Sequence, residues 1–193
     1  WFQPRKVKRY DKRRFRGQRR RYAPRGVTTP GYIEMDSITL YIMGKRWLFM
    51  SVIDVATRYE YCTVVASISS SEARRVFLEF QKRFPSPVTT IQTDNGSEFL
   101  GVFHAYCLFH GITHEFIYPR SPKINGMVER VNRTVQEECI ERTDEVFYDQ
   151  ERFKLKLADY LTWYNTKRPH MSLRLQTPIQ VLQQFTSSIP KCM

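Results

Sequence analysis

The order of the apolar segments constrains the fold of this chain more than any other feature. Alternating or continuous apolar patterns predict three strands, at 32–42, 46–56 and 60–67, and a turn at 43–45 joins the first two. Helices and strands then alternate along the chain: helix 69–84, strand 88–93, helix 97–111, strand 113–118, helix 125–143 and helix 149–168. Strands first, followed by alternating helices and strands, predict an α/β domain.

Polar and small residues mark the ends of the predicted helices. Ser70 or Ser71 is the expected N-cap of helix 69–84, and Gly111 is expected to close helix 97–111. Pro169 should end the last helix because it lacks a backbone N–H. Glu98 is interpreted as a carboxylate that favours the positive end of its helix.

Three carboxylates stand out against this pattern. Asp36 interrupts an alternating apolar strand, Asp94 follows directly after strand 88–93, and Glu129 lies within a helical pattern. Each of them alone would be an ordinary surface carboxylate. Brought together, they would repel one another unless a cation lay between them, and hard oxygen ligands suit Mg2+ or Mn2+. The three residues are therefore candidate metal ligands.

The alternation of a strand separates Asp36 from a fourth acid, Asp54. If the first two strands pair around Gly44, position 36 lies across from about position 53, so that Asp36 points to the same face as Ile53. Asp54 then points to the opposite face. We expect Asp54 to be a turn or cap residue near Arg58 rather than a metal ligand.

Four motifs follow one another along the second half of the chain. They are TDNGSEF at 93–99, YPRSPKINGMVERVNRT at 118–134, WYNTKRPHMSL at 163–173 and the pair Thr177-Pro178. Together they resemble the integrase core that bacterial insertion-sequence transposases share with retroviral integrases. The resemblance runs from about Gly31 to about Phe185, and the WYNTKRPH variant followed by TP is closer to the bacterial transposases.

The resemblance implies a ribonuclease H-like fold, an α/β fold with a five-stranded mixed sheet flanked by helices. Residues 31–185 would form the catalytic core, residues 1–30 a basic arm or linker, and residues 186–193 a C-terminal tail. In such a fold strand 88–93 lies parallel and next to the first strand. Asp94 then stands at a strand end, where sites of open α/β sheets form, and Glu129 reaches that edge from a crossing helix.

The same resemblance implies a DNA transposase or integrase with Asp36, Asp94 and Glu129 as its catalytic, metal-binding triad. Two ions of Mg2+ or Mn2+ about 3.5–4 Å apart would act on a phosphodiester, with Asp36 bridging both. Hydrolysis would free a 3′-hydroxyl at an element end, and that hydroxyl would then attack target DNA. Relatives work as multimers that bridge two DNA ends, so the expected partners are DNA and further copies of the chain.

Candidate DNA contacts surround the three carboxylates: Asn95, Lys123, Arg130, Arg133 and Gln136. Asn95 and Gly96 would shape the turn after Asp94, and the glycine would allow a phosphate to approach closely. A plain Asn-Gly turn is the alternative. The two arginines would contact phosphates or form a solvated helix face. Gln136 departs from many bacterial relatives, which carry Lys or Arg seven residues after the catalytic glutamate.

The basic charge of the chain is concentrated at its start. Residues 1–26 hold 12 Lys or Arg and one Asp, a formal charge of +11, whereas the other residues hold 19 basic and 18 acidic side chains. Such an arm most often binds nucleic acid phosphate; an anionic membrane surface and a solvated linker are the alternatives. The arginines expected to contact DNA are Arg13, Arg14, Arg19, Arg20 and Arg21.

The chain offers no sequence signal for a membrane or secreted protein. No apolar run approaches the ~20 residues of a membrane span, and no apolar segment follows the first charges. The bacterial resemblance implies a cytoplasmic, nucleoid-associated protein. Because the chain begins at Trp1, we interpret it as a fragment whose end-recognising DNA-binding domain precedes it.

Cysteine and histidine spacing does not predict a zinc site. The four cysteines form no CxxC pair, which favours free thiols. His104, Cys107, His110 and His114 have a spacing compatible with metal binding, but on an apolar helix packing is the favoured interpretation.

Two other functions stay open at the level of sequence. A ribonuclease H-like nuclease would cut without strand transfer, and the WYNTKRPH motif disfavours it. An inactive DNA-binding relic would no longer need the triad, which is intact, although Gln136 is compatible with that reading.

Overall fold

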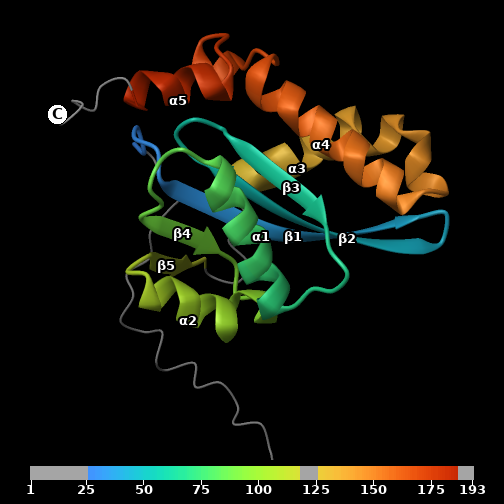
Figure 1. Ribbon diagram of the computed structural model, residues 1–193, viewed down its shortest axis with the longest axis horizontal. Coiled ribbons are helices and arrows are strands. Elements are labelled where there is room, and N and C mark those ends of the chain that lie inside the picture. The colour runs from blue at the N-terminus through green and yellow to red at the C-terminus, as the bar shows by residue number, and fades with distance from the viewer. Residues whose placement is uncertain (1–25, 118–125, 187–193) are drawn as a thin grey trace, which may run out of the picture.

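The computed structural model describes residues 26–117 and 126–186 and places a five-stranded mixed sheet at their centre (Figure 1). The strands are β1 (Tyr32–Ile42), β2 (Lys45–Asp54), β3 (Glu60–Val64), β4 (Thr90–Thr93) and β5 (Thr113–Phe116). Their order is β3-β2-β1-β4-β5. β1 pairs antiparallel with β2 and parallel with β4, which confirms the predicted neighbour of the first strand.

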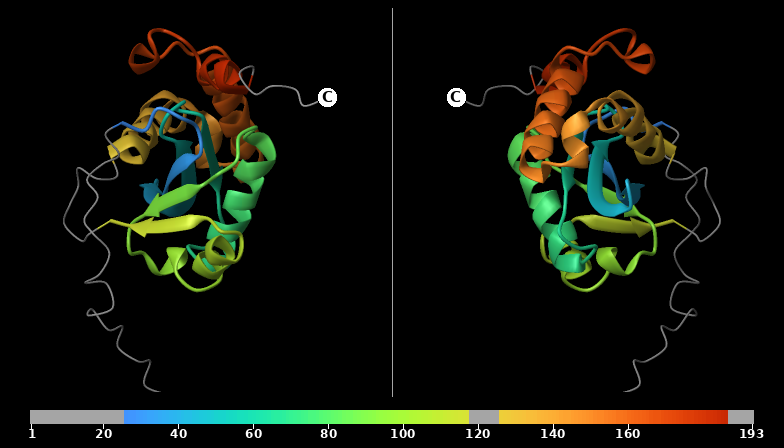
Figure 2. Two further views of the ribbon diagram at one scale, coloured as in Figure 1. Left: turned by 90° about the vertical axis from the view of Figure 1, so that its left-hand side faces the viewer. Right: turned by 90° about the vertical axis from the view of Figure 1, so that its right-hand side faces the viewer.

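Helices cover both faces of the sheet. They are α1 (Ser70–Arg83), α2 (Val102–Phe109), α3 (Gly126–Glu138), α4 (Gln150–Thr166) and α5 (Pro178–Thr186). Side views show α1 and α2 on one side of the strands and α3 and α4 on the other (Figure 2). Short 3-10 turns lie between them, at Ser97–Phe99, Ile140–Arg142, Asp144–Phe147 and Met171–Leu173.

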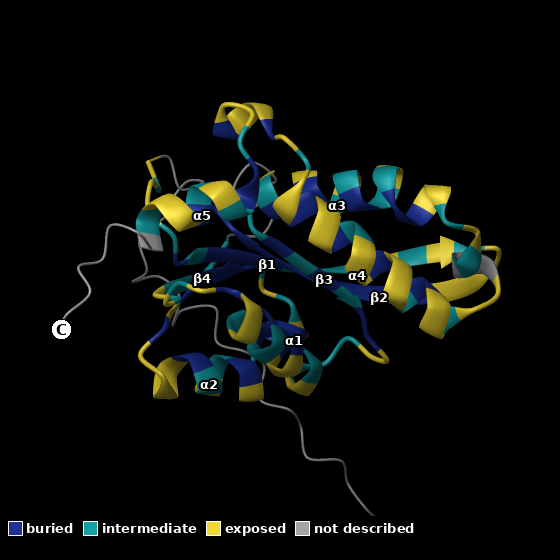
Figure 3. Ribbon diagram, turned by 45° about the horizontal axis from the view of Figure 1, so that its top comes forward, coloured by how far each residue is buried: buried dark blue, intermediate teal, exposed yellow. Residues whose placement is uncertain are grey.

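The alternation of β1 separates two apolar layers. Ile33 and Met35 are fully buried in the cluster that α1 and α2 complete. Ile38 and Leu40 pack against the cluster formed with α4, which contains Phe153. Burial coloring shows the central strands as the most deeply buried part of the fold (Figure 3). Glu34 and Asp36 belong to the same row as Ile38, so they point toward the α3 and α4 side.

The turn between β1 and β2 corrects the predicted register. Ile42 pairs directly with Lys45, so the loop has two residues, and both have positive φ angles, 47° at Met43 and 75° at Gly44. Asp36 therefore lies opposite Ser51, two positions from the expected partner Ile53. A shift of two residues keeps each side chain on its face, so the predicted orientation of Asp36 holds.

The predicted helix 97–111 is two separate elements. A 3-10 turn at Ser97–Phe99 is followed by α2, and Gly101 between them has φ 59° and ψ −120°, a conformation that suits glycine. Ser70 spans this break, because its hydroxyl donates to the Leu100 carbonyl and accepts from the Phe103 N–H. Gly111 closes the second element with φ 68°, as predicted.

The start of α1 also differs from the prediction. Ser69 is the N-cap and accepts a hydrogen bond from the Glu72 N–H at 3.3 Å. Ser70 is not available for that role because its hydroxyl binds the segment before α2. The apolar face of α1 is nevertheless fully buried.

The last helix, α5, was not predicted. Thr177 and Gln180 form a reciprocal capping box, in which the Thr177 N–H donates to Oε1 of Gln180 at 2.9 Å and the Gln180 N–H donates to the Thr177 hydroxyl at 3.3 Å. Pro178 occupies the first helical position, where its missing N–H costs nothing. Leu182 anchors the helix in the layer of α1 and α2.

Within the residues that the structure describes, no helix has the length and apolar character needed to cross a bilayer.

Candidate active site

The parallel pairing of β1 and β4 brings Asp36 and Asp94 to the same edge of the sheet. Glu34 pairs with Gln92 in this ladder, so Asp36 and Asp94 are each two residues farther along neighbouring strands. Asp94 directly follows β4, at its carboxyl end. Their proximity is also visible in their electrostatics, because the Asp94 charge contributes to a raised pKa at Asp36.

Asp36 is a partly buried carboxylate with two hydrogen-bonded oxygens. The Ser37 N–H donates to Oδ1 at 2.9 Å, and Nδ2 of Asn132 donates to Oδ2 at 3.0 Å. The pKa of Asp36 is raised to about 6, mainly by burial and also by the nearby charges of Asp94, Glu129 and Glu98, whereas the Ser37 hydrogen bond lowers it. A cation would relieve this repulsion.

The contact of Asn132 shows which way α3 faces. Glu129 lies three residues before Asn132, so the two side chains share a face of the helix, and that face is turned toward Asp36. Val128, Val131 and Val135 occupy the buried face. Glu129 itself is exposed. The structure therefore brings all three predicted carboxylates to one edge of the sheet.

A fourth carboxylate, Glu98, belongs to the same cluster. Its side chain is 8% exposed, and Oε1 accepts a hydrogen bond from the Ser37 hydroxyl at 2.5 Å. The sequence interpretation of Glu98 as a helix-end charge missed this role. Its spacing from Asp94 gives no signal, because the contact depends on the strand 61 positions earlier.

Gly96 allows the two acidic side chains of this turn to approach. A Cβ at this position would lie 2.6 Å from Oε2 of Glu98 and 2.9 Å from Oδ1 of Asp94. The Gly96 N–H donates to the same Asp94 oxygen at 2.8 Å. Burial raises the pKa of Asp94, and the charge of Glu98 adds to this against the Gly96 hydrogen bond. In this structure the groups that lie close to Gly96 are carboxylates of the chain itself.

The chemistry of these side chains fits a hard divalent cation. All candidate ligands are carboxylate oxygens, and an oxygen with one hydrogen bond keeps a second lone pair. No hydrogen bond or ion pair joins the Glu129 carboxylate to another described residue. As they stand, no three His, Cys, Asp or Glu side chains in 26–117 and 126–186 converge closely enough to hold one ion. These carboxylates are suitable ligands, and they would have to move closer together to bind one ion.

The candidate DNA contacts have different surroundings. Nδ2 of Asn95 donates to the Ile117 carbonyl, so this side chain braces the turn after β4 against the end of β5. Arg130 and Arg133 are exposed on α3. Nε2 of Gln136 donates to Glu141 at 2.9 Å. The other candidates lie outside the described residues: Lys123, Arg13, Arg14, Arg19, Arg20 and Arg21.

Asp54 is a turn residue, as predicted. Its Oδ1 accepts from the Gly31 N–H at 2.8 Å, and its Oδ2 accepts from the backbone and the hydroxyl of Thr57 at 2.8 and 2.6 Å. These bonds fix the turn that ends β2. All of them hold Asp54 away from the cluster around Asp36, on the opposite face of the sheet.

The WYNTKRPH motif docks the end of α4 onto the rest of the fold. Asn165 hydrogen-bonds both the N–H and the carbonyl of Glu60 in β3, at 2.9 and 2.8 Å. Arg168 forms two hydrogen bonds with the Glu138 carboxylate at the end of α3, at 2.9 and 2.6 Å. The motif therefore has a structural role, because it holds the end of α4 against β3 and α3.

The histidines of the metal-like spacing pack against one another. Nδ1 of His104 lies 2.9 Å from Nδ1 of His114, and Nε2 of His114 lies 2.9 Å from the Thr93 hydroxyl. Cys107 is buried in the apolar core instead. Cys62 and Cys139 are likewise free and buried.

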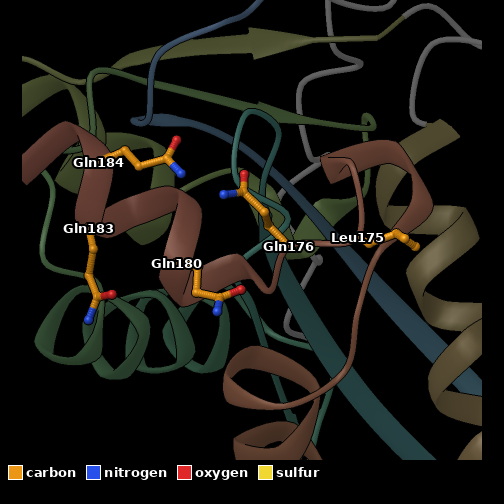
Figure 4. Close-up of a pocket in the computed structure, with 5 residues that line it drawn as sticks. All are labelled: Leu175, Gln176, Gln180, Gln183 and Gln184. Atoms are coloured by element: carbon orange, nitrogen blue, oxygen red, sulfur yellow. The ribbon is translucent and has the colours of Figure 1, made fainter.

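A shallow hollow of about 660 Å³ lies on α5 and the loop before it (Figure 4). Its lining is Leu175, Gln176, Gln180, Gln183 and Gln184. None of the clustered carboxylates contributes to it. The hollow is therefore separate from the candidate active site at the sheet edge.

The sequence matches known integrase domains over most of its length. Residues 28–122 and residues 110–178 match two family models, each described as an integrase core domain. The chain belongs to the integrase core family. This integrase core contains all three predicted carboxylates, with Asp36 and Asp94 in the first matched range and Glu129 in the second.

Two relatives illustrate how widely such cores occur. The integrase-type protein ORF3 of Spiroplasma virus SpV1-C74 is 27% identical over 177 residues, which is 81% of this chain and 48% of that protein. A retrovirus-related Pol polyprotein from the transposon TNT 1-94 of Nicotiana tabacum is 32% identical over 112 residues, 55% of this chain and 8% of the polyprotein. The integrase core thus spans about half of one relative and a small part of the other.

Solved integrase structures share the fold. A chain of the simian T-cell lymphotropic virus intasome, solved with PP2A regulatory subunit B56 gamma, has a TM-score of 0.71 at 20% identity, covering 89% of this chain and 59% of that one. The HTLV-2 integrase catalytic core, in complex with magnesium and in a trimeric form, has a TM-score of 0.66 at 18% identity over 81% and 99%. The BIV catalytic core gives 0.60 at 19% over 82% and 97%. The predicted ribonuclease H-like fold is therefore confirmed.

Proposed function

We propose that residues 31–185 are the catalytic core of a DNA transposase or integrase, with Asp36, Asp94 and Glu129 as its metal ligands. The observation that supports the proposal is that three carboxylates from separate elements lie at one edge of the sheet, where the charges of Asp94 and Glu129 both act on Asp36. Parallel pairing of β1 with β4 aligns the two aspartates, and the Asn132 contact to Asp36 turns the Glu129 face of α3 toward them.

The reactions proposed are metal-dependent hydrolysis at an element end and transfer of the resulting 3′-end into target DNA. Mg2+ or Mn2+ ions held by these residues would supply Lewis-acid chemistry: they would lower the pKa of a bound water and neutralise charge on the leaving oxygen. Asp36 is influenced by the charges of both Asp94 and Glu129, so it is the residue of the three that would be suited to a contact with both ions. Ser37 and Asn132 hold its two oxygens in place.

DNA is the proposed partner, and a homo-oligomer is the proposed working form. Arg130 and Arg133 stand exposed on the same helix as Glu129, where they would hold phosphates beside the ligands. Two similar structures are an intasome and a trimeric, magnesium-bound core, which supports both a metal and an assembly for this chain. In a bacterium these reactions would take place on the nucleoid.

The test is disintegration of a branched DNA substrate in Mg2+ and in Mn2+. Asp36→Asn, Asp94→Asn and Glu129→Gln should each abolish metal-dependent joining and cleavage while leaving folding and DNA binding largely intact. Glu79→Gln is the control: it is an acid-to-amide change at a half-buried position of α1 that pairs with Lys82 and Arg83 of the same helix, and it should keep full activity. A triad variant with near-normal activity would remove its residue from the ligand set.

The same experiment separates the two competing functions. Cleavage that is lost in the triad variants, without any joining by the wild type, would identify a nuclease. Intact DNA binding without either reaction, in this chain and in a longer protein that contains it, would identify an inactive relic.

A further inference from the structure

Glu34 is a buried acid that links β1 to the first turn of α3. Its side chain is 0% exposed, and Oε2 accepts hydrogen bonds from the N–H groups of Met127 and Val128 at 3.1 and 2.9 Å. Its second oxygen, Oε1, has no hydrogen-bond partner within the part of the chain that is described. The acid contacts the helix residues that directly precede Glu129.

The position of this carboxylate matches the chemistry of a helix start. The first N–H groups of an α-helix lack partners within the helix, and the partial positive charge there favours an anion. Such groups are usually capped by a residue just before the helix. Here the cap comes from a strand 93 and 94 positions away, so it fixes the helix to the sheet as well as closing its end.

A second attachment lies farther along the same two elements, from Asp36 to Asn132. Glu34 and Asp36 are two residues apart on one face of β1, a spacing of about 6.6 Å. Val128 and Asn132 are four residues apart on α3, a rise of about 6 Å. The two spacings match, so both contacts form at once only when α3 lies along β1 in one register. Glu129 is held between them.

We propose that Glu34 is a positioning residue that fixes the first turn of α3 on β1 and thereby sets the place of Glu129 relative to Asp36. The expected effect on metal binding rests on the proposed function, because the place of Glu129 matters to a metal only if Glu129 is a ligand. The attachment itself is a property of the fold. An apolar side chain would fill the same space without the cost of burying a carboxyl, so what Glu34 adds is its pair of hydrogen bonds.

The test compares variants that keep and remove the acceptor oxygen. Glu34→Gln retains an oxygen of the same reach, whereas Glu34→Leu has none. Loss of groups that orient metal ligands typically weakens metal binding about 10–100-fold. We expect Glu34→Leu to weaken Mn2+ binding, measured by electron paramagnetic resonance on the folded protein, by about tenfold or more, and Glu34→Gln to change it less than about threefold.

Glu60 provides the matched control. It is also a buried acid of the same sheet, 1% exposed, with one oxygen bonded to the Ser51 hydroxyl and the other unpartnered among the described residues. Its carboxyl binds within the sheet, and its backbone N–H and carbonyl bind Asn165 of α4 rather than a residue of α3. Glu60→Leu should lower the stability and leave Mn2+ affinity unchanged. An equal loss of affinity in Glu60→Leu and Glu34→Leu would reduce Glu34 to a general stabilising role and overturn the proposal.

A second variant covers the case in which Glu34→Leu does not fold. Met127→Pro removes one of the two donors from the helix side, at a first-turn position where proline is tolerated. It should also weaken Mn2+ binding and speed amide exchange at Val128. Wild-type affinity in a folded Glu34→Leu or Met127→Pro protein would overturn the assignment.

Two readouts separate this proposal from the proposed function. Amide exchange over the first turn of α3 reports on the Glu34 attachment without any metal. Mn2+ binding by Asp36→Asn reports on the ligand set: wild-type affinity there would contradict the proposed function, while faster exchange in Glu34→Leu would still support the attachment. Unchanged exchange in Glu34→Leu would contradict the attachment whatever the metal does.

Discussion

At Gly96 the absence of a side chain allows two carboxylates of the cluster to lie close together. The backbone angles there, φ −59° and ψ 143°, are accessible to alanine, so an added methyl would act only through contacts. Its Cβ would meet Oε2 of Glu98 at 2.6 Å and Oδ1 of Asp94 at 2.9 Å. Glu98 cannot swing away without breaking its bond to Ser37.

Gly96→Ala should therefore displace Glu98 or Asp94 from the candidate site. We expect the Mn2+ concentration for half-maximal joining to rise about tenfold, the scale typical of disturbed metal surroundings. Gly126→Ala is the control, because among the described residues no atom beyond its chain neighbours and its own helix lies within 4 Å of the added Cβ, and its φ is not positive. Equal Mn2+ requirements for the two variants would show that the contact at Gly96 has no bearing on the site.

Sequence analysis missed several individual residues of the site for one common reason. Asp36 interrupts an apolar strand, Asp94 follows directly after one, and Glu129 lies in a motif of its own, so each could be singled out from its neighbours in the chain. Glu34, Glu98 and Asn132 break none; they act through contacts 61 to 96 positions away in sequence. Such contacts become visible only once the pairing of β1 and the direction of α3 are known.

At the scale of elements, the junction of β4, β5 and α2 depends on one neutral histidine. His114 lies 5% exposed on β5, between the Thr93 hydroxyl of β4 and Nδ1 of His104 on α2. Two facing ring nitrogens can share one proton but not carry two. The pKa of His114 is lowered to about 3, mainly by burial and also by the nearby His104.

Acid should therefore loosen this junction. The pKa of His114 in the folded chain lies below the value of about 6.5 for an unfolded histidine, so the unfolded chain binds the proton first as the pH falls. The contribution of neutral His114 is complete above pH 6.5 and declines toward pH 3, by at most about 1.4 kcal/mol per pH unit.

Urea unfolding at pH 7 and pH 5 measures this effect. Between them the wild type should lose about 1–2 kcal/mol more unfolding free energy than His114→Phe, since the difference cancels the buried acids that both proteins share. Parallel pH profiles for the two proteins would show that His114 titrates normally.

The elements themselves were largely predictable, and the errors fall where local rules compete. Helices α1, α3 and α4 and all five strands follow the periodicity of their apolar residues. The apolar period predicts one helix over 97–111, but the backbone at Gly101 is not helical and interrupts it. Helix α5 carried its signal in Thr177, Pro178 and Gln180, but the pair Thr177-Pro178 was interpreted as a motif and not as a helix start.

For the whole molecule, the uneven charge distribution separates DNA attraction from chemistry. The residues after position 26 carry a formal charge of +1, so their field alone would attract DNA weakly, and residues 1–26 carry +11. Binding that releases counterions from DNA weakens with salt, with a log–log slope of about −0.9 for each phosphate neutralised. If residues 1–26 make those contacts, they account for the salt dependence of DNA binding.

Deleting residues 1–26 should weaken non-specific DNA binding and flatten its salt dependence, as measured by fluorescence anisotropy from 50 to 300 mM salt. Because the proposed ligands all lie beyond the deletion, Mn2+ binding should not change.

A chain in which residues 1–26 are rearranged with the same composition is the control. Recovery of the slope by the rearranged arm would establish that charge alone drives the attraction, whereas recovery only by the natural order would point to specific contacts of its arginines and aromatic residues. A slope unaffected by the deletion would exclude the arm as a DNA contact and move the attraction to the exposed arginines of α3.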